Sequence, residues 1–156
     1  MPNFLSLACR GLAIILALSL TATIAAAADS GRYSKQKVVY HINENGGEGD
    51  QVYLRALNNI QNHINAVGAE NLTLKVVLHG DGVNMLKDAV SNLRLQGQVI
   101  NLKSQNVSFL VCKNTLVQRK IDPEKDLFEV YEEDIVPSGV AELSHLQQQG
   151  FTYVKP

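Results

Sequence analysis

The chain has 156 residues, of which 46% are hydrophobic and 19% are charged, and its formal net charge at pH 7 is −1. This length suits a single domain built around one hydrophobic core. The sequence has no basic run and no interleaving of basic and aromatic residues, which are the usual signs of a nucleic-acid-binding protein. We therefore expect no nucleic-acid partner.

The first 28 residues have the layout of a secretory signal peptide. A start with one basic residue, Arg10, is followed by the uncharged apolar run Gly11–Ile24 and by the small residues Ala25–Ala28, which offer cleavage sites. The apolar run is shorter than the roughly 20 residues that span a bilayer. We predict a bacterial signal peptide over residues 1–28 and a periplasmic domain over residues 29–156, with no membrane association after cleavage. An uncleaved N-terminal anchor is the alternative.

From residue 37 onward, short apolar segments alternate with amphipathic ones. The predicted strands are Lys37–Ile42, Leu72–His79, Val107–Cys112, a fourth that ends at Ile135–Val136, and Phe151–Val154. The predicted helices run from an Asp50 cap to Val67, from Val83 to about Val90, from Asn92 to Ser104, from Thr115 to Lys120, and from Pro137–Gly139 to Gly150. The acidic segment Glu124–Asp134 is left unassigned. Strands that alternate with helices favour right-handed βαβ crossovers, which predict an α/β protein with a parallel sheet covered on both faces.

Polar residues stand where the predicted strands end. Asn43 follows the first strand, His79 and Gly80 close the second, and Cys112 ends the third, with Asn114 just beyond it. Parallel strands end at a common edge of the sheet, and ligands of open α/β sheets bind at that edge. We therefore expect these residues to meet there and to form a polar pocket around the thiol.

Cys112 is the main candidate for a reactive group. Cys9 lies in the predicted signal peptide, so the mature domain has one cysteine and cannot form an internal disulfide. We predict that Asn114 caps the helix Thr115–Lys120, whose N-terminus would stabilise a thiolate. A lone cysteine in an exported protein is reactive, paired between subunits, or inert and buried, and the sequence leaves these alternatives open.

Other chemistry has little support. A metal site would need three or four ligands, and only His79, Cys112 and His41 could converge. We rank His41 lower, as a residue on the opposite face of its strand, and we predict neither a metal nor a cofactor. A thiol oxidoreductase would need a resolving cysteine, which the mature domain lacks.

Several segments together resemble the DsrE/DsrF-like family, and in particular its exported, single-domain bacterial branch. They are Lys37–Ile42 with Asn43, the strand that closes in His79-Gly80, the strand Val107–Cys112 with Lys113-Asn114-Thr115-Leu116, and the segment Pro137–Leu143. The resemblance implies a three-layer α/β/α sandwich around a five-stranded, mostly parallel sheet, and assembly into homo-oligomers such as trimers or hexamers. In sulfur-trafficking members of the family, a cysteine at the position of Cys112 accepts sulfur as a persulfide and passes it to a partner protein.

Our first hypothesis is therefore a sulfur carrier or sulfurtransferase-like relay that uses Cys112 and works with a sulfur donor or acceptor protein. The residues expected to shape its substrate pocket are Asn43, His79, Gly80, Asn114 and Thr115. Whether such a relay turns over as an enzyme stays open. The alternative is a non-enzymatic, oligomeric module that binds a small ligand, in which Cys112 only packs. A third possibility is metal or redox sensing through His79 and Cys112.

Overall fold

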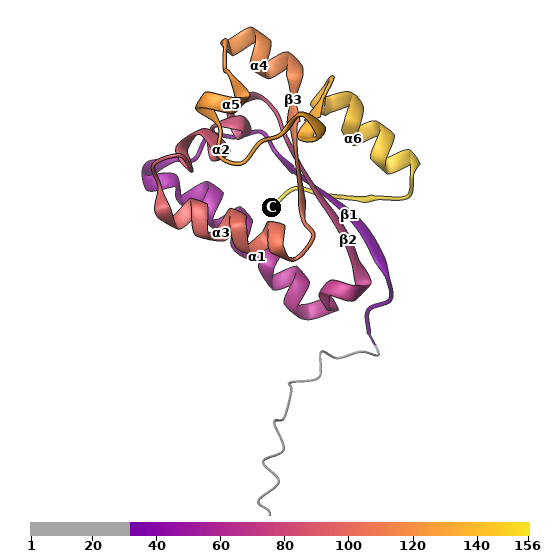
Figure 1. Ribbon diagram of the computed structural model, residues 1–156. Coiled ribbons are helices and arrows are strands. Elements are labelled where there is room, and N and C mark those ends of the chain that lie inside the picture. Colours follow the sequence, from indigo (N-terminus) through magenta and orange to yellow (C-terminus); the bar gives the residue numbers. More distant parts are fainter. Residues whose placement is uncertain (1–31) are drawn as a thin grey trace, which may run out of the picture.

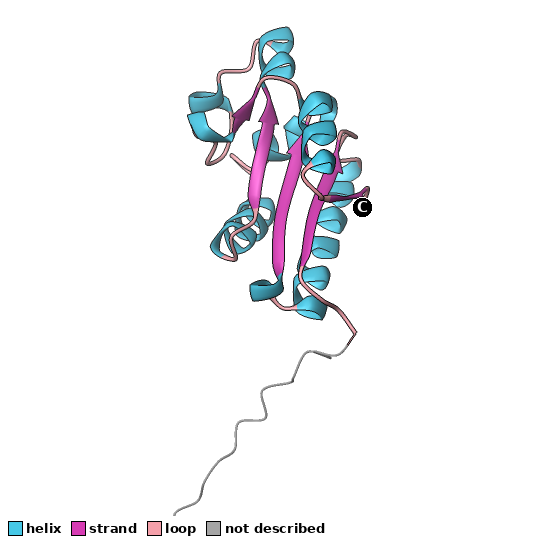
Figure 2. Ribbon diagram, turned by 90° about the vertical axis from the view of Figure 1, so that its right-hand side faces the viewer, coloured by secondary structure: helices cyan, strands magenta, loops and turns pink. Residues whose placement is uncertain are grey.

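Five parallel strands form one sheet in the order β4-β3-β2-β1-β5 in a computed structural model of the chain, which describes residues 32–156 (Figures 1 and 2). The predicted signal peptide, residues 1–28, lies outside the described residues. The strands are β1 (Gln36–Ile42), β2 (Leu72–Leu78), β3 (Ser108–Cys112), β4 (Ile135–Val136) and β5 (Thr152–Val154). Every pair of neighbouring strands is parallel, so all five carboxyl ends lie at the same edge of the sheet.

Helices cover both faces of this sheet. They are α1 (Gln51–Val67), α2 (Asn84–Asp88), α3 (Leu93–Ser104), α4 (Lys113–Arg119), α5 (Pro123–Asp126) and α6 (Gly139–Gln148), with short 3-10 turns η1 (Glu48–Asp50), η2 (Ala69–Asn71), η3 (Gly80–Val83) and η4 (Glu132–Asp134). In Figure 1, α1 and α3 lie on one side of the strands, α6 lies on the other, and α4 lies at the carboxyl-end edge. The predicted three-layer α/β/α sandwich around a five-stranded sheet is confirmed, and every strand pair is parallel.

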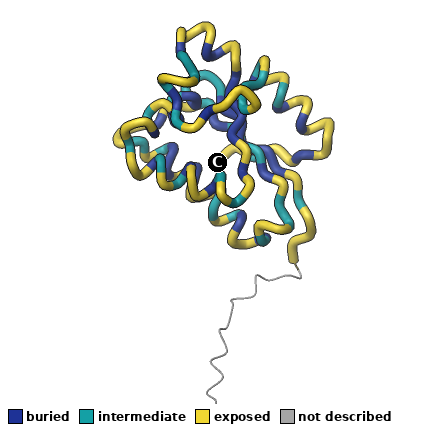
Figure 3. The backbone as a smooth tube through the Cα atoms, in the orientation of Figure 1, coloured by how far each residue is buried: buried dark blue, intermediate teal, exposed yellow. Residues whose placement is uncertain are grey.

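The alternation of side chains along the strands divides the core into two clusters. On β1, Val38, Tyr40 and Ile42 face the layer of α1 and α3, whereas Val39 faces α6. Successive side chains of a strand point to opposite faces, so residue 41 also lies on the α6 side. The cluster against α1 and α3 is the larger of the two. In Figure 3 many of the buried residues lie in the middle of the molecule. The α6 face is therefore covered thinly, which leaves room for polar side chains at its carboxyl-end edge.

The acidic segment that the sequence left unassigned forms two short turns. Asp122 accepts a hydrogen bond from the Glu124 N–H at 3.1 Å and so caps α5, whose first residue is Pro123. Beyond α5, the Phe128 N–H donates to the Leu86 carbonyl at 2.9 Å. This segment carries the chain back to the sheet, where β4 pairs with β3.

Among residues 32–156, no helix combines the length and the apolar character that crossing a bilayer requires.

Candidate functional site

The register of the sheet places Cys112 beside His79. Leu78 pairs with Val111, so the residues that follow them, His79 and Cys112, are neighbours at the carboxyl-end edge. On the other side, Cys112 pairs with Val136 of β4. Since Val77 and Leu110 belong to the cluster under α6, His79 and Cys112 lie on that same face. The expected meeting of these two residues at one edge is therefore present.

Donor groups near the sulfur atom of Cys112 lower the pKa of its thiol. They are the backbone N–H groups of Asn114, Thr115 and Gly139 and the hydroxyl of Thr115. The same hydroxyl accepts a hydrogen bond from the Gly80 N–H at 3.0 Å. Donors fixed in this way stabilise a negative charge on the sulfur.

The donors change the balance between thiol and thiolate. Burial of Cys112, which is 5% exposed, acts to raise its pKa, but the hydrogen bonds from Gly139, Thr115 and Asn114 outweigh this effect. The pKa of the Cys112 thiol is consequently lower than its ordinary value, so a larger share of it is thiolate than in a free cysteine at the same pH. The environment is thus suited to a nucleophilic sulfur.

The donors come from the first turns of two helices. Cys112 is itself the N-cap of α4, which begins at Lys113, so the prediction that Asn114 caps this helix was wrong. Asn114 instead lies in the first turn with its side chain exposed, and only its N–H reaches the sulfur. The second helix is α6, where Ser138 is the N-cap and accepts a hydrogen bond from the Ala141 N–H at 3.4 Å. The positive ends of both helix dipoles therefore face Cys112.

Gly139 brings α6 into close contact with the edge of the sheet. A Cβ atom at position 139 would lie 2.9 Å from the Cβ of His79 and 3.3 Å from the Cβ of Cys112. Only glycine at position 139 allows the α6 backbone to come this close to His79 and Cys112, with its N–H near the Cys112 sulfur. The sequence identified Pro137-Ser138-Gly139 as a helix start but did not indicate this contact, because it depends on how α6 docks.

A row of hydrogen-bonded side chains extends from His79 across the sheet. His79 Nε2 lies 2.7 Å from His41 Nε2, and His41 Nδ1 lies 2.7 Å from the Tyr153 hydroxyl. The prediction that His41 lies on the opposite face was wrong, since it lies on the same face as His79 and Cys112. Tyr153 was not among the candidates, because nothing in the C-terminal strand points to it until β5 pairs with β1.

Both histidines of this row are held neutral. Burial lowers the pKa of His41 to about 4, with further lowering from His79 and Lys155. Glu44 acts in the other direction but is paired with Lys155 at 2.8 Å. Burial and Lys155 also lower the pKa of His79. At neutral pH these rings therefore take part in hydrogen bonds as neutral imidazoles, each with one donor and one acceptor nitrogen.

The other predicted pocket residues have different roles. Gly80 and Thr115 lie beside the sulfur through the hydrogen bond between them. The Asn43 side chain turns away, since its Oδ1 accepts a hydrogen bond from Lys155 Nζ at 2.8 Å. The Asn43 backbone carbonyl nevertheless lies near Gly80. Asn43 therefore helps to shape the edge without reaching the sulfur.

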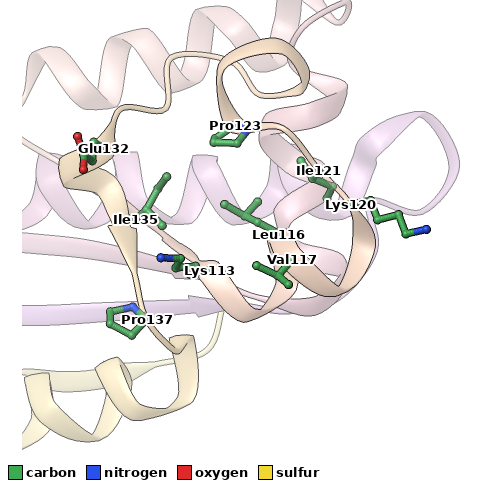
Figure 4. A pocket seen from close by; sticks show the side chains of 9 residues that line it. All are labelled: Lys113, Leu116, Val117, Lys120, Ile121, Pro123, Glu132, Ile135 and Pro137. Atoms are coloured by element: carbon green, nitrogen blue, oxygen red, sulfur yellow. The ribbon is translucent and has the colours of Figure 1, made fainter.

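A separate cavity lies beside α4 (Figure 4). Its volume is about 560 Å³, and mostly apolar side chains line it, among them Leu116, Val117 and Ile135. Three charged residues, Lys113, Lys120 and Glu132, also line it. Cys112 is not among its lining residues. Within residues 32–156, no three histidine, cysteine, aspartate or glutamate side chains are grouped so that they could hold a metal ion.

The fold and the site define an α/β protein with a hydrogen-bonded thiol at the carboxyl-end edge of a parallel sheet. The model of the DsrE/DsrF-like family matches residues 36–156, and the chain belongs to this family. A solved structure similar to this chain is MTH1491, a protein of unknown function from Methanobacterium thermoautotrophicum. The two are 30% identical with a TM-score of 0.65, and the similarity covers 78% of this chain and 100% of that one. A search of curated proteins gave no match.

Proposed function

We propose that the protein carries sulfane sulfur as a persulfide on Cys112. The observation that supports this role best is the lowered pKa of a single thiol at the edge of the sheet, caused by donor groups of Gly139, Thr115 and Asn114 that outweigh its burial. A sulfur carrier needs a thiolate that attacks a sulfur donor and later departs as a good leaving group. Donors that lower the pKa of the thiol serve both steps, because a more stable thiolate leaves more readily.

The proposed chemistry consists of two thiol exchanges. In loading, the Cys112 thiolate attacks the outer sulfur of a donor persulfide, a new S–S bond forms, the donor S–S bond breaks, and the donor leaves as a thiolate. In unloading, an acceptor thiolate attacks the outer sulfur on Cys112, and the electron pair of the broken bond returns to the Cys112 sulfur. No net oxidation occurs, so the chain needs no second cysteine and no redox cofactor for this cycle.

Location and assembly belong to the same proposal. The signal peptide predicted over residues 1–28 suggests action in the periplasm, with a donor and an acceptor protein in that compartment. We propose a homo-oligomer such as a trimer or a hexamer, as the family resemblance implies. Val117 and Val140, which are exposed beside the edge that carries Cys112, are apolar surface that such assembly or a partner could cover.

The second candidate function is a non-enzymatic module that binds a small ligand. Burial of Cys112 favours it, because a thiol that is 5% exposed is hard for a donor to reach. In that function Cys112 is a packing residue, and its replacement by alanine leaves ligand binding intact.

Intact-mass measurement separates the two functions. The purified protein and its Cys112→Ser variant are incubated with glutathione persulfide, and peptide mapping separates Cys112 from Cys9 if both are present. We expect one or more sulfur atoms on Cys112, removed by reductant and absent from the variant. Absence of any gain, together with slow alkylation of Cys112 in the folded protein, would exclude the carrier function and leave the binding module.

A further inference from the structure

The row Tyr153–His41–His79 forms a continuous path of hydrogen bonds from the protein surface to the neighbour of Cys112. Tyr153 is 41% exposed, while His41 and His79 are partly buried. The two imidazole planes are inclined by 25°, and their centroids are 4.7 Å apart. With 2.7 Å between the Nε2 atoms, the rings meet through their nitrogen edges rather than through their faces.

This geometry allows two proton arrangements. A hydrogen bond between two Nε2 atoms holds one proton, so one ring donates and the other accepts. If His79 donates, then His41 carries its other proton on Nδ1 and donates to Tyr153, and the Nδ1 of His79 is bare. If His41 donates, then Tyr153 donates to His41 Nδ1, and the Nδ1 of His79 carries a proton. Whether His79 Nδ1 carries a proton is thus coupled to the direction in which the hydrogen bonds of the row are donated. Both imidazoles are neutral in either arrangement.

The Nδ1 atom of His79 is the end of the row that has no hydrogen-bond partner among residues 32–156. Gly139 packs against the Cδ2 edge of the ring, so Nδ1 lies on the opposite edge. The hydrogen bonds formed among residues 32–156 use Nε2 of this ring and leave Nδ1 unpaired. Donor groups of Asn114, Thr115 and Gly139 already lower the pKa of the Cys112 thiol. A proton-exchanging group beside it would instead serve the sulfur of the donor or acceptor molecule.

We propose that Tyr153, His41 and His79 form a proton wire between solvent and the sulfur atom of the reacting partner. The inference rests on the proposed carrier function and assigns the proton transfers of its two half-reactions. His79 is the catalytic residue, because it touches the partner's sulfur, whereas His41 and Tyr153 are positioning residues that act through it. The lowered pKa values of both histidines agree with a wire that works through neutral rings.

The two proton arrangements match the two half-reactions. In unloading, the acceptor thiol gives its proton to His79 Nδ1, the Nε2 proton moves to His41, the His41 Nδ1 proton moves to Tyr153, and the Tyr153 proton goes to water. The acceptor thiolate then attacks the outer sulfur, and Cys112 leaves as a thiolate. In loading, the departing donor thiolate takes the proton from His79 Nδ1, each proton shifts back, and Tyr153 takes one from water. One complete cycle therefore returns the wire to its first arrangement.

The test compares two acceptors on the same loaded protein. Cys112 is loaded with glutathione persulfide, and the loss of sulfur is followed by mass in single turnovers. One acceptor is 2-mercaptoethanol, whose thiol is protonated at neutral pH, and the other is an aryl thiol such as 5-thio-2-nitrobenzoate, which is already ionised. The variants are His79→Gln, His41→Gln and Tyr153→Phe, with Tyr131→Phe as the control because Tyr131 is exposed and remote from the row.

We expect His79→Gln and His41→Gln to slow transfer to 2-mercaptoethanol about 100-fold, at the lower end of the range for general acid–base catalysis. Tyr153→Phe should slow it about tenfold, because water can replace the hydroxyl in part. Transfer to the aryl thiol and the pH profile of Cys112 alkylation should change less than about twofold, and Tyr131→Phe should change neither.

Equal slowing with both acceptors would mean that the row only supports the structure, and unchanged rates would mean that it moves no proton. Either result overturns the wire while the carrier function stands. Failure of the wild-type protein to load sulfur would overturn the carrier function and the wire together.

Discussion

Two tyrosine–histidine networks start from neighbouring residues of β1 and lie on opposite faces of the sheet. On the α1 face, the Tyr40 hydroxyl lies 2.9 Å from His63 Nδ1, and His63 Nε2 lies 2.9 Å from the Gln36 side-chain oxygen. On the α6 face, His41 joins Tyr153 to His79. His63 is partly buried, and both of its ring nitrogens are hydrogen-bonded.

The difference between the networks is the number of proton arrangements that each allows. The Gln36 amide turns its oxygen to His63 Nε2, and in this placement His63 donates from Nε2 and accepts from Tyr40 at Nδ1. That network has a single arrangement and ends in protein groups, as a structural support does. The network of His41 has two arrangements and ends at an open nitrogen beside Cys112. Both networks join a tyrosine to a histidine, but they differ in whether protons can shift along them. The difference comes from the group at the end of each network.

Gly139→Ala should perturb the open network most. The added methyl group would lie 2.9 Å from the His79 Cβ and 3.3 Å from the Cys112 Cβ, so α6 must shift and its N–H must leave the sulfur. We expect alkylation of Cys112 at neutral pH to slow more than tenfold, and stability to fall by about 1–3 kcal/mol, as for other overpacked sites. Iodoacetamide kinetics and denaturant unfolding measure the two effects.

Gly97→Ala is the matched control. Gly97 lies inside α3, and a Cβ there would meet no atom within 4 Å. This substitution should raise stability by about 0.5–1 kcal/mol, because alanine is the better helix former, and it should leave alkylation unchanged. Equal alkylation rates in both variants would contradict the role assigned to the close contact at Gly139.

Thr115→Val tests whether the donors around the sulfur act independently of the histidines. It removes the hydroxyl that donates to Cys112 and accepts from the Gly80 N–H. We expect the pKa of Cys112 to rise and alkylation at neutral pH to slow about fivefold, the effect of losing one hydrogen bond of about 1 kcal/mol. The pH profile of alkylation measures the change, and Thr115→Ser should restore most of it. A profile that does not move in Thr115→Val would exclude the hydroxyl as a donor.

The smallest expected effect is a pH dependence of stability. The pKa of His41 in the folded protein is about 4, below the ordinary value of 6.5, so between these values the unfolded chain binds more protons than the folded one. The contribution of neutral His41 is therefore complete above pH 6.5 and is lost as the pH falls toward 4. The denaturant midpoint of the wild-type protein should fall over this window, and that of His41→Gln should fall less. If the denaturant midpoints of the wild-type protein and of His41→Gln fell equally, the lowered pKa of His41 would not be the cause of the pH dependence.

His63→Gln extends this experiment to the closed network. Burial also lowers the pKa of His63, so its variant should likewise lose less stability on acidification. Transfer of sulfur to 2-mercaptoethanol should remain at the wild-type rate in His63→Gln, in contrast to His41→Gln. This pair of variants separates a histidine that supports the fold from one that serves the reaction.

Local patterns in the sequence determined the class of fold. Apolar segments of strand length alternate with helical ones, and this alternation predicted the βαβ order, the parallel sheet and the edge at which Cys112 and His79 meet. The segment Glu124–Asp134 escaped prediction because its two turns are short, and the stretch between them is held by a distant partner, the Leu86 carbonyl, which accepts from the Phe128 N–H. The order of the strands and the pairing of β5 with β1 are likewise set by contacts between segments far apart in the chain.

The candidate site depended on tertiary structure to a greater degree. The sequence alone identified Cys112 as the thiol to examine and placed Gly80 and Thr115 near it, because strand ends and helix starts are local features. It did not reveal that Gly139 supplies a donor or that Tyr153 meets His41, since both contacts arise from the docking of α6 and β5. The alternation of residues along a strand determines the face of the sheet on which a side chain lies. The residue that it contacts on that face depends on how the helices and strands pack together.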